Sequence, residues 1–229
     1  MKKGKFIVVD GTDGSGKATQ VKLLVSRLKG AGIRVKTIDF PRYYENLFGK
    51  MIGECLAGEH GDFRQFSPYV ASALYAADRF ESSTEIKKWL DEGCMVLADR
   101  YTSSNQMHQG GKIGDDKERE DFLSWLDRME FGIFKIPRPS AILFLDVPTD
   151  FVLNLLKNKS AKKKKDYLKG RADAHESSAD HLRAARESAL KIIQKNNNWI
   201  RINCVQDDRL LSKREVNDLV WKELKKILK

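Results

Sequence analysis

A glycine-rich segment near the start of the sequence, GTDGSGKAT at residues 11–19, matches the pattern G-x-x-x-x-G-K. The apolar run KFIVVD precedes it directly, and apolar residues at helical spacing follow it at 19–28. We therefore predict a buried strand, a tight loop and a helix in succession. Glycine permits positive φ and close backbone approach, so backbone N–H groups and the helix N-terminus can hold phosphate oxygens. The segment predicts a nucleotide-phosphate loop, and a turn that binds nothing is the less favoured alternative.

Within this loop, Lys17 is predicted to reach the β- and γ-phosphates of a nucleotide. The next position departs from the pattern, because Ala18 stands where a Ser or Thr hydroxyl would ligate Mg²⁺. We expect the ion to be held by Thr19, or by water and a carboxylate, with Asp99 and Asp10 as candidates. The residues predicted to contact ATP are Gly11, Thr12, Asp13, Gly14, Ser15, Gly16, Lys17, Ala18 and Thr19.

Along the rest of the chain, short apolar runs alternate with helical patterns. Strands are predicted at 5–10, 34–40, 95–99, 141–146 and 199–203. Helices are predicted at 19–28, 47–56, 67–90 (one long helix), 118–128, 150–157, 180–195 and 215–228. This alternation is typical of a parallel sheet with helices on both faces. Since no repeat or linker divides the sequence, we predict one α/β domain over 1–229 with a five-stranded parallel sheet.

Composition and cysteine usage exclude several classes of protein. Hydrophobic residues make up 41% of the chain and charged residues 32%, which excludes a disordered protein. The cysteines Cys55, Cys94 and Cys204 are far apart, so neither a disulfide framework nor a structural zinc site is expected. The apolar runs fall well short of the roughly 18 residues that span a bilayer, and the N-terminal run is too short for a secretory leader. We expect a soluble, cytoplasmic protein with no membrane partner.

The positive charge is concentrated in one segment. The chain has a formal charge of +10, and residues 157–171 hold eight Lys and Arg residues against a single acid, Asp166. Because the rest of the chain is close to balanced, no specific nucleic-acid partner is predicted. The segment is a solvated surface run, a contact for a polyanion, or a loop that closes over phosphates.

Polar and aromatic residues follow two of the predicted strands. The run FPRY at 40–43 ends the second strand and DRYTSSNQMHQ at 99–109 ends the third, at the edge where parallel sheets bind ligands. Tyr75 and Arg79 are four residues apart, hence on one face of their predicted helix, where they can stack on a base and bond its edge. Each residue alone has an ordinary structural explanation, but their common edge favours a phosphate-handling cleft.

Four blocks make the sequence resemble the thymidylate kinase family: GTDGSGKAT, FPRY, ALYAADRFE at 73–81 and DRYTSSNQMHQ. The turn AGEHGD at 57–62 and the run LDVP at 145–148 add to a likeness that extends from residue 11 to about 180. The resemblance implies a P-loop kinase that transfers the γ-phosphoryl group of ATP to dTMP with Mg²⁺. It also implies a homodimer formed through the predicted helix at 67–90.

The resemblance further implies roles for individual residues. Asp13 is expected to position the sugar and phosphate of the acceptor, and Arg100 to hold that phosphate. Tyr43 would disfavour a ribose 2′-hydroxyl, Tyr75 would stack on thymine, and Arg79 would bond a thymine carbonyl. The residues at the family's substrate-binding positions are Asp13, Phe40, Arg42, Tyr43, Tyr75, Arg79, Arg100, Ser104, Asn105 and His108.

The basic segment falls where this family has its lid, a mobile loop that closes over the ATP phosphates, at about 157–178. Because the phosphate loop has Gly14 in place of an arginine, the resemblance implies that the lid supplies a basic catalytic group. Arg171, Lys169 and Lys165 are the candidates. The predicted catalytic residues are Lys17, Arg100, Asp13 and Arg171.

Two positions depart from the family pattern. His108 stands where an aromatic residue would flank the base, and Ala18 lacks the hydroxyl. Two alternatives therefore stay open: a kinase for another acceptor such as dUMP, and a P-loop protein that binds nucleotide or polyanion without turnover. The FPRY and DRY blocks have no purpose in such a binding protein, so a kinase is favoured.

Overall fold

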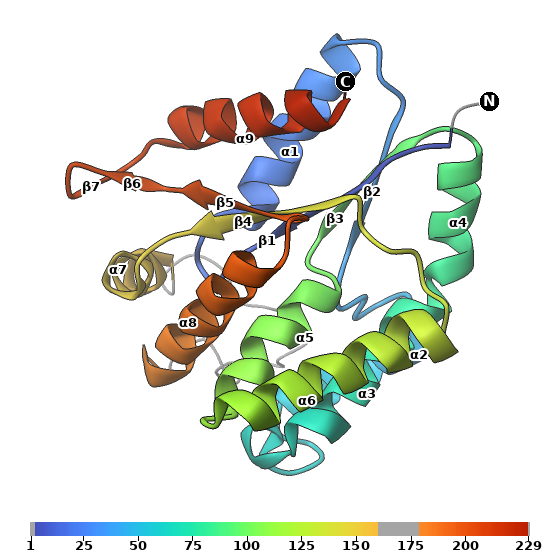
Figure 1. Cartoon of the computed structure of the whole chain (residues 1–229), viewed down its shortest axis with the longest axis vertical. Helices are drawn as coiled ribbons and strands as arrows, with labels where there is room; N and C mark the ends of the chain where they lie inside the picture. Colours follow the sequence, from blue (N-terminus) through green and yellow to red (C-terminus); the bar gives the residue numbers. More distant parts are fainter. Residues whose placement is uncertain (1–2, 160–178, 229) are drawn as a thin grey trace.

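A single parallel sheet of five strands forms the centre of the computed structural model, which describes residues 3–159 and 179–228 (Figure 1). The strands are β1 (Phe6–Asp10), β2 (Val35–Asp39), β3 (Met95–Asp99), β4 (Ala141–Asp146) and β5 (Trp199–Asn203), in the spatial order β2-β3-β1-β4-β5. All four pairings between them are parallel. The predicted α/β fold class and five-stranded parallel sheet are confirmed. The basic segment predicted as the lid, including Arg171, lies for its greater part outside the described residues.

Helices cover both faces of this sheet, as Figure 1 shows. The helices are α1 (Lys17–Gly30), α2 (Leu47–Leu56), α3 (Pro68–Glu81), α4 (Ser83–Asp91), α5 (Thr102–His108), α6 (Asp116–Asp127), α7 (Thr149–Lys159), α8 (Ala179–Lys195) and α9 (Lys213–Leu228). Ile7 and Val9 of β1 pack in the cluster that buries α1 and α9, whereas Phe6 and Val8 pack with α4, α5 and α8. This alternation follows from the period of two along a strand. Both faces of the sheet are therefore hydrophobic core.

The prediction of one long helix at 67–90 is wrong, because the chain bends at Ser82 between α3 and α4. Ser82 is buried, and its hydroxyl oxygen accepts hydrogen bonds from Arg42 and Asn46. The two helices cover different surfaces. Ala71 of α3 packs in a cluster with α2, whereas Ile86 of α4 packs against the sheet. One straight helix could not bury both apolar faces.

Six short elements have no counterpart in the sequence prediction. Helix α5 follows β3 directly, and α6 continues as a π-helical segment, η3 (Arg128–Ile133). Strands β6 (Val205–Gln206) and β7 (Arg209–Leu210) form a hairpin whose turn residues, Asp207 and Asp208, have positive φ. Short 3₁₀ turns, η1 (Phe63–Gln65) and η2 (Gly110–Lys112), complete the described elements. These pieces are short, and a periodic hydrophobic pattern does not reveal them.

All three cysteines are buried in the fold. Cys55, Cys94 and Cys204 have free thiols in the structure. Within residues 3–159 and 179–228, no helix has both the length and the apolar character that crossing a bilayer requires.

Candidate active site

The loop after β1 has the geometry of a phosphate-binding loop. It runs from Gly11 to the first residue of α1, Lys17. A side chain is excluded at Gly11, because a Cβ there would lie 2.6 Å from Ser15 Oγ and 2.8 Å from the Leu145 carbonyl oxygen. Gly16, directly before α1, has φ 95°, in the left-handed region that favours glycine. The predicted order of strand, loop and helix is confirmed.

Ser15 gives this loop an unsatisfied polar atom. Its Oγ is buried and has no hydrogen-bond partner among the residues that the structure describes. A buried hydroxyl without a partner costs free energy, and native proteins rarely leave one unpaired. A phosphate oxygen of a bound nucleotide would satisfy it, so the loop fits the ligand that its sequence predicts.

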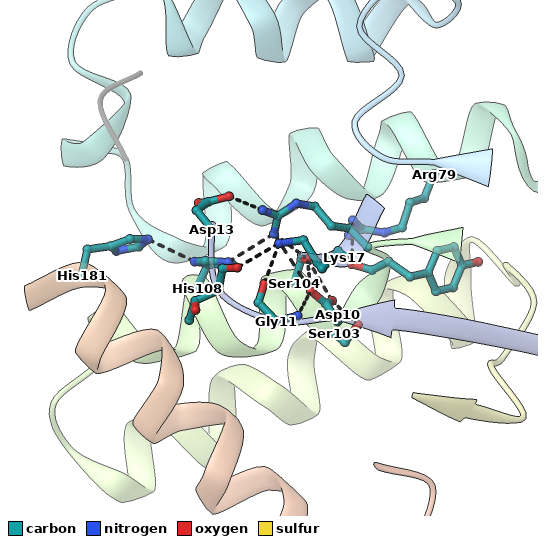
Figure 2. A network of polar contacts seen from close by, with 12 residues as sticks. Asp10, Gly11, Asp13, Lys17, Arg79, Ser103, Ser104, His108 and His181 are labelled. Atoms are coloured by element: carbon teal, nitrogen blue, oxygen red, sulfur yellow. Dashed lines mark hydrogen bonds and ion pairs between the residues drawn. The ribbon is translucent and has the colours of Figure 1, made fainter. Parts of the chain in front are cut away.

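Lys17 folds back over the loop (Figure 2). Its Nζ donates hydrogen bonds to the carbonyl oxygens of Gly11 at 2.9 Å and Thr12 at 3.0 Å. Burial, reinforced by the charge of Arg100 and opposed by nearby carboxylates, lowers the pKa of Lys17 to about 8. The ammonium is thus held beside the loop, and the nearby carboxylates only partly offset the effect of its burial.

Arg100 follows β3 and is held on three sides. Its guanidinium forms an ion pair with Asp13 of the loop. Its Nη1 lies 3.3 Å from Ser104 Oγ and 3.3 Å from His108 Nε2. The backbone of Arg100 has φ 67°, which is uncommon for a residue with a long side chain. Such strain costs about 1–3 kcal/mol and persists at functional sites where the surroundings impose it.

Asp10, the last residue of β1, forms hydrogen bonds that connect the start of α5 to the phosphate loop. It is fully buried, and its carboxylate accepts hydrogen bonds from the hydroxyls of Ser103 at 2.5 Å and Ser104 at 2.9 Å. The N–H of Gly11 donates to it at 2.8 Å. Figure 2 shows these groups converging on the end of the strand. Because the protein already satisfies its oxygens, Asp10 is the weaker of the two predicted carboxylates for a metal ion.

Arg79 of α3 is another buried residue of the site. Its Nε and Nη2 donate to the two carboxylate oxygens of Glu130 at 2.7 and 2.8 Å, and both side chains are at most 2% exposed. Its Nη1 donates to the Tyr101 carbonyl oxygen at 3.4 Å, and the guanidinium carbon lies 5.9 Å from the centre of the Tyr101 ring. The bidentate contact fixes the plane of the guanidinium.

Lys17, Arg100 and Arg79 line one cavity of about 390 Å³ at the carboxyl ends of β1, β2 and β3. The volume is in the range of small-molecule sites. The predicted site residues that line it are Asp13, Gly14, Gly16, Lys17, Ala18, Thr19, Phe40, Tyr43, Tyr75, Arg79, Asp99, Arg100, Ser104, Asn105 and His108. The phosphate loop and the residues predicted for the acceptor therefore face the same space.

The sequence model of thymidylate kinases matches residues 9–214, most of the chain. The chain belongs to the thymidylate kinase family. It is 35% identical over 153 residues to a thymidylate kinase of Plasmodium falciparum, covering 67% of this chain and 66%, just under two thirds, of that protein. It is 29% identical over 208 residues to a probable thymidylate kinase of Thermococcus kodakarensis, covering 88% of this chain and 90% of that protein.

The fold of this chain is also found in a solved structure of a thymidylate kinase. A thymidylate kinase from Candida albicans superposes with a TM-score of 0.73 at 22% identity, covering 99% of this chain and 94% of that one. The expectation that the sequence belongs to this kinase family is confirmed, and the P-loop fold with it.

One substrate-binding residue inferred from the thymidylate kinase family lies outside the cavity lining. The Nη1 of Arg42 donates to Ser82 Oγ at 3.1 Å and to Glu85 Oε2 at 2.9 Å, so α4 already pairs its charge. The contact of Arg42 with a monophosphate stays a prediction. Arg171, the predicted catalytic lid residue, lies in the part of the chain that the structure does not describe.

The donor chemistry of the site fits the magnesium ion that thymidylate kinases generally use. The described residues hold no cluster of three or more His, Cys, Asp or Glu side chains that could bind a metal alone. Mg²⁺ is commonly held by one or two carboxylates together with water and substrate phosphates. Asp99, Lys17 and Thr19 all line the cavity, and burial raises the pKa of the Asp99 carboxyl group. That Asp99 or Thr19 would hold the ion stays a prediction.

Sequence reasoning missed two residues that shape the site. Glu130 holds Arg79 from a π-helical segment 51 positions along the chain. His181 of α8 lines the cavity and contacts His108 across 73 positions. Neither residue lies in a motif. The only signals in the sequence are that Glu130 is an isolated acid in the apolar run MEFGI and that His181 stands at the start of the predicted helix at 180–195.

Proposed function

We propose that this chain transfers the γ-phosphoryl group of ATP to the phosphate of dTMP, giving ADP and dTDP. The observation that carries the proposal is the ion pair between Asp13 of the phosphate loop and Arg100 at the end of β3. It brings the group that would hold the acceptor phosphate against the loop that would hold the donor. Membership of the thymidylate kinase family supports the choice of dTMP as acceptor.

The chemistry requires positioning and charge neutralisation more than a strong base. An oxygen of the acceptor phosphate attacks the γ-phosphorus, and the bond from that phosphorus to the β–γ bridging oxygen breaks, so its electron pair leaves on ADP. The acceptor phosphate is ionised near neutral pH, since its second pKa is about 6. Lys17 and Arg100 neutralise charge on the two phosphate groups, and a bound Mg²⁺ would add further electrostatic stabilisation.

Base recognition is proposed for the far end of the cavity. Tyr75 lines it and offers a ring on which thymine can stack. Glu130 occupies the Nε and Nη2 of Arg79, and Nη1 carries a second N–H besides the one that reaches Tyr101. We propose that this N–H donates to a thymine carbonyl. Asn105, whose Nδ2 donates to the Ser72 carbonyl oxygen, would flank the base.

A homodimer is the assembly that we propose. Apolar side chains are exposed on α2 and α3, among them Leu47 at 69%, Val70 at 54% and Phe80 at 49%. Helices α2 and α3 pack together, so these exposed apolar side chains offer a surface that an interface between protein chains would bury. Sedimentation velocity tests this: the wild type should sediment as a dimer, and F80D should shift the population toward monomer. A wild-type monomer at micromolar concentration would refute the proposal.

The function is tested by measuring ADP release with Mg-ATP across dTMP, dUMP, dCMP, dGMP, AMP and UMP. We expect a strong preference for dTMP and a loss of turnover by orders of magnitude in K17A. K22A, which removes an exposed lysine one turn and a half along α1, is the matched control and should keep full activity. Turnover with another acceptor alone would overturn the base assignment. ATP binding with no turnover at all would overturn the kinase assignment.

A further inference from the structure

Two histidines form a chain of contacts that ends on Arg100. His108 of α5 lies with its Nε2 3.3 Å from Arg100 Nη1 and its Nδ1 3.1 Å from His181 Nε2. The two rings are nearly parallel, with planes 19° apart and centres separated by 5.3 Å. Figure 2 shows His181 and His108 pointing toward each other, joined by a dashed line. These contacts link helix α8 to Arg100, the arginine that we propose holds the acceptor phosphate.

The direction of each hydrogen bond in this chain is fixed by chemistry. A guanidinium can only donate, so His108 Nε2 must accept from Arg100 and carry no proton. In a neutral imidazole the proton then lies on Nδ1, which donates to His181 Nε2. Protonation of either ring would set N–H against N–H and break the chain. His108 is thus confined to one tautomer by its two neighbours.

The surroundings of His108 favour this neutral form. Burial lowers the pKa of His108 well below its usual value, and Arg100 lowers it further. Within residues 3–159 and 179–228, the charged or titratable groups that face it are Arg100 after β3, Asp13 of the phosphate loop, Lys17 of α1 and His181 of α8. Of these, Asp13 alone favours the protonated form. Its carboxylate is already paired with Arg100.

We propose that His108 and His181 are positioning residues for the acceptor phosphate: they hold Arg100 through a single imidazole tautomer and tie it to α8. The proposal rests on the proposed function, since it assigns Arg100 to the dTMP phosphate. A purely aromatic residue at position 108 could fill the same space but could not accept from Arg100. The departure at His108 from the family pattern therefore changes how Arg100 is held.

The tautomer is tested first, because that measurement does not depend on catalysis. In protein with ¹⁵N-labelled histidine, long-range ¹H–¹⁵N correlation distinguishes a protonated Nδ1 from a protonated Nε2. The chain has four histidines, and H108Q and H181Q assign the two resonance sets. We expect His108 to stay neutral with its proton on Nδ1 from about pH 8 to about pH 6, below the ordinary histidine pKa of about 6.5. A protonated Nε2, or titration at the ordinary value, would overturn the proposal.

Kinetics with dTMP then separate positioning from packing. H108F keeps a ring of similar shape without the acceptor, whereas H108Q keeps an acceptor oxygen without the ring. We expect H108F to raise the KM for dTMP about tenfold, since a hydrogen bond to a charged group is worth about one power of ten or more. The rise in H108Q should be at least about threefold smaller, and the KM for ATP should change less than about twofold in both. Equal KM values for dTMP in the two variants, with melting temperatures matched, would refute a positioning role.

A double-substitution cycle tests whether the two histidines act as one unit. H181F should raise the KM for dTMP less than H108F does, because it removes the outer contact of the chain. If the two histidines act as one unit, the KM for dTMP of H108F/H181F should be no higher than that of H108F alone. Additive losses would show that His181 acts independently of His108. If the wild type does not phosphorylate dTMP, the proposed function fails, and the tautomer spectrum still decides whether the histidine chain exists.

Discussion

Arg79 and Glu130 form a bidentate ion pair in the interior, with Nε to Oε2 at 2.7 Å and Nη2 to Oε1 at 2.8 Å. The side chain of Glu130 is fully buried, and that of Arg79 is 2% exposed. Burial raises the pKa of Glu130, although the charge of Arg79 opposes that shift. The pair thus fixes an arginine that lines the cavity, and each buried charge is neutralised by the other.

Removing the carboxylate charge at Glu130 should destabilise the fold strongly. E130Q leaves the guanidinium of Arg79 buried without a counter-charge, and breaking one half of a buried pair costs about 3–5 kcal/mol. Urea unfolding followed by circular dichroism measures the change. D127N is the matched control, because Asp127 pairs with Arg138 in a largely exposed bridge whose loss should cost less than about 1 kcal/mol. Equal costs for the two variants would contradict this account.

Whether the sequence predicted a contact of this site depends on how far apart the two residues are in the sequence. The phosphate loop and the strand ends are local patterns, so their residues could be placed from spacing alone. The partner of Arg79 is 51 positions away, and the partner of His108 is 73 away. Such pairings are decided by how helices pack on the sheet, which a one-dimensional pattern does not contain.

The bend at Ser82 shows the same limit in a single element. Helical periodicity continues through residues 67–90, and Ser82 is a tolerable residue inside a helix. What ends α3 is the hydrogen bonding of Ser82 with Arg42 and Asn46, from a different segment. Tertiary contacts override local propensity there, and only the structure reveals them.

Substituting alanine for Gly11 and for Gly30 should change the stability of the fold in opposite directions. G11A should destabilise the fold and weaken ATP binding, because the added Cβ would meet the Leu145 carbonyl oxygen at 2.8 Å. G30A should stabilise by about 0.5–1 kcal/mol, since Gly30 lies in α1 with open space around its Cβ position. Thermal unfolding of both variants measures the signs. An increase in melting temperature for G11A would show that the loop backbone can move aside.

The three thiols should resist modification in the folded protein. Burial raises the pKa of Cys204 to about 12, and burial also raises the pKa of Cys55, so the reactive thiolate is scarce at neutral pH. Titration with a thiol-reactive disulfide at neutral pH should label them slowly in native protein and at once in guanidinium chloride. Rapid labelling of one thiol under native conditions would locate a part of the chain that opens without global unfolding.

ATP binding should take up protons above pH 8. The pKa of Lys17 is about 8 in the substrate-free protein, so the lysine loses its charge as the pH rises through that value. Phosphate charge beside Nζ favours the protonated form and raises this pKa again, so affinity for ATP should fall as the pH increases beyond about 8. Titration calorimetry at about pH 8.5, in two buffers of different ionisation enthalpy, should show net uptake of up to one proton. K17R carries a charge that does not titrate in this range and should show no such uptake. Equal proton uptake in K17R and the wild type would assign the proton to another group.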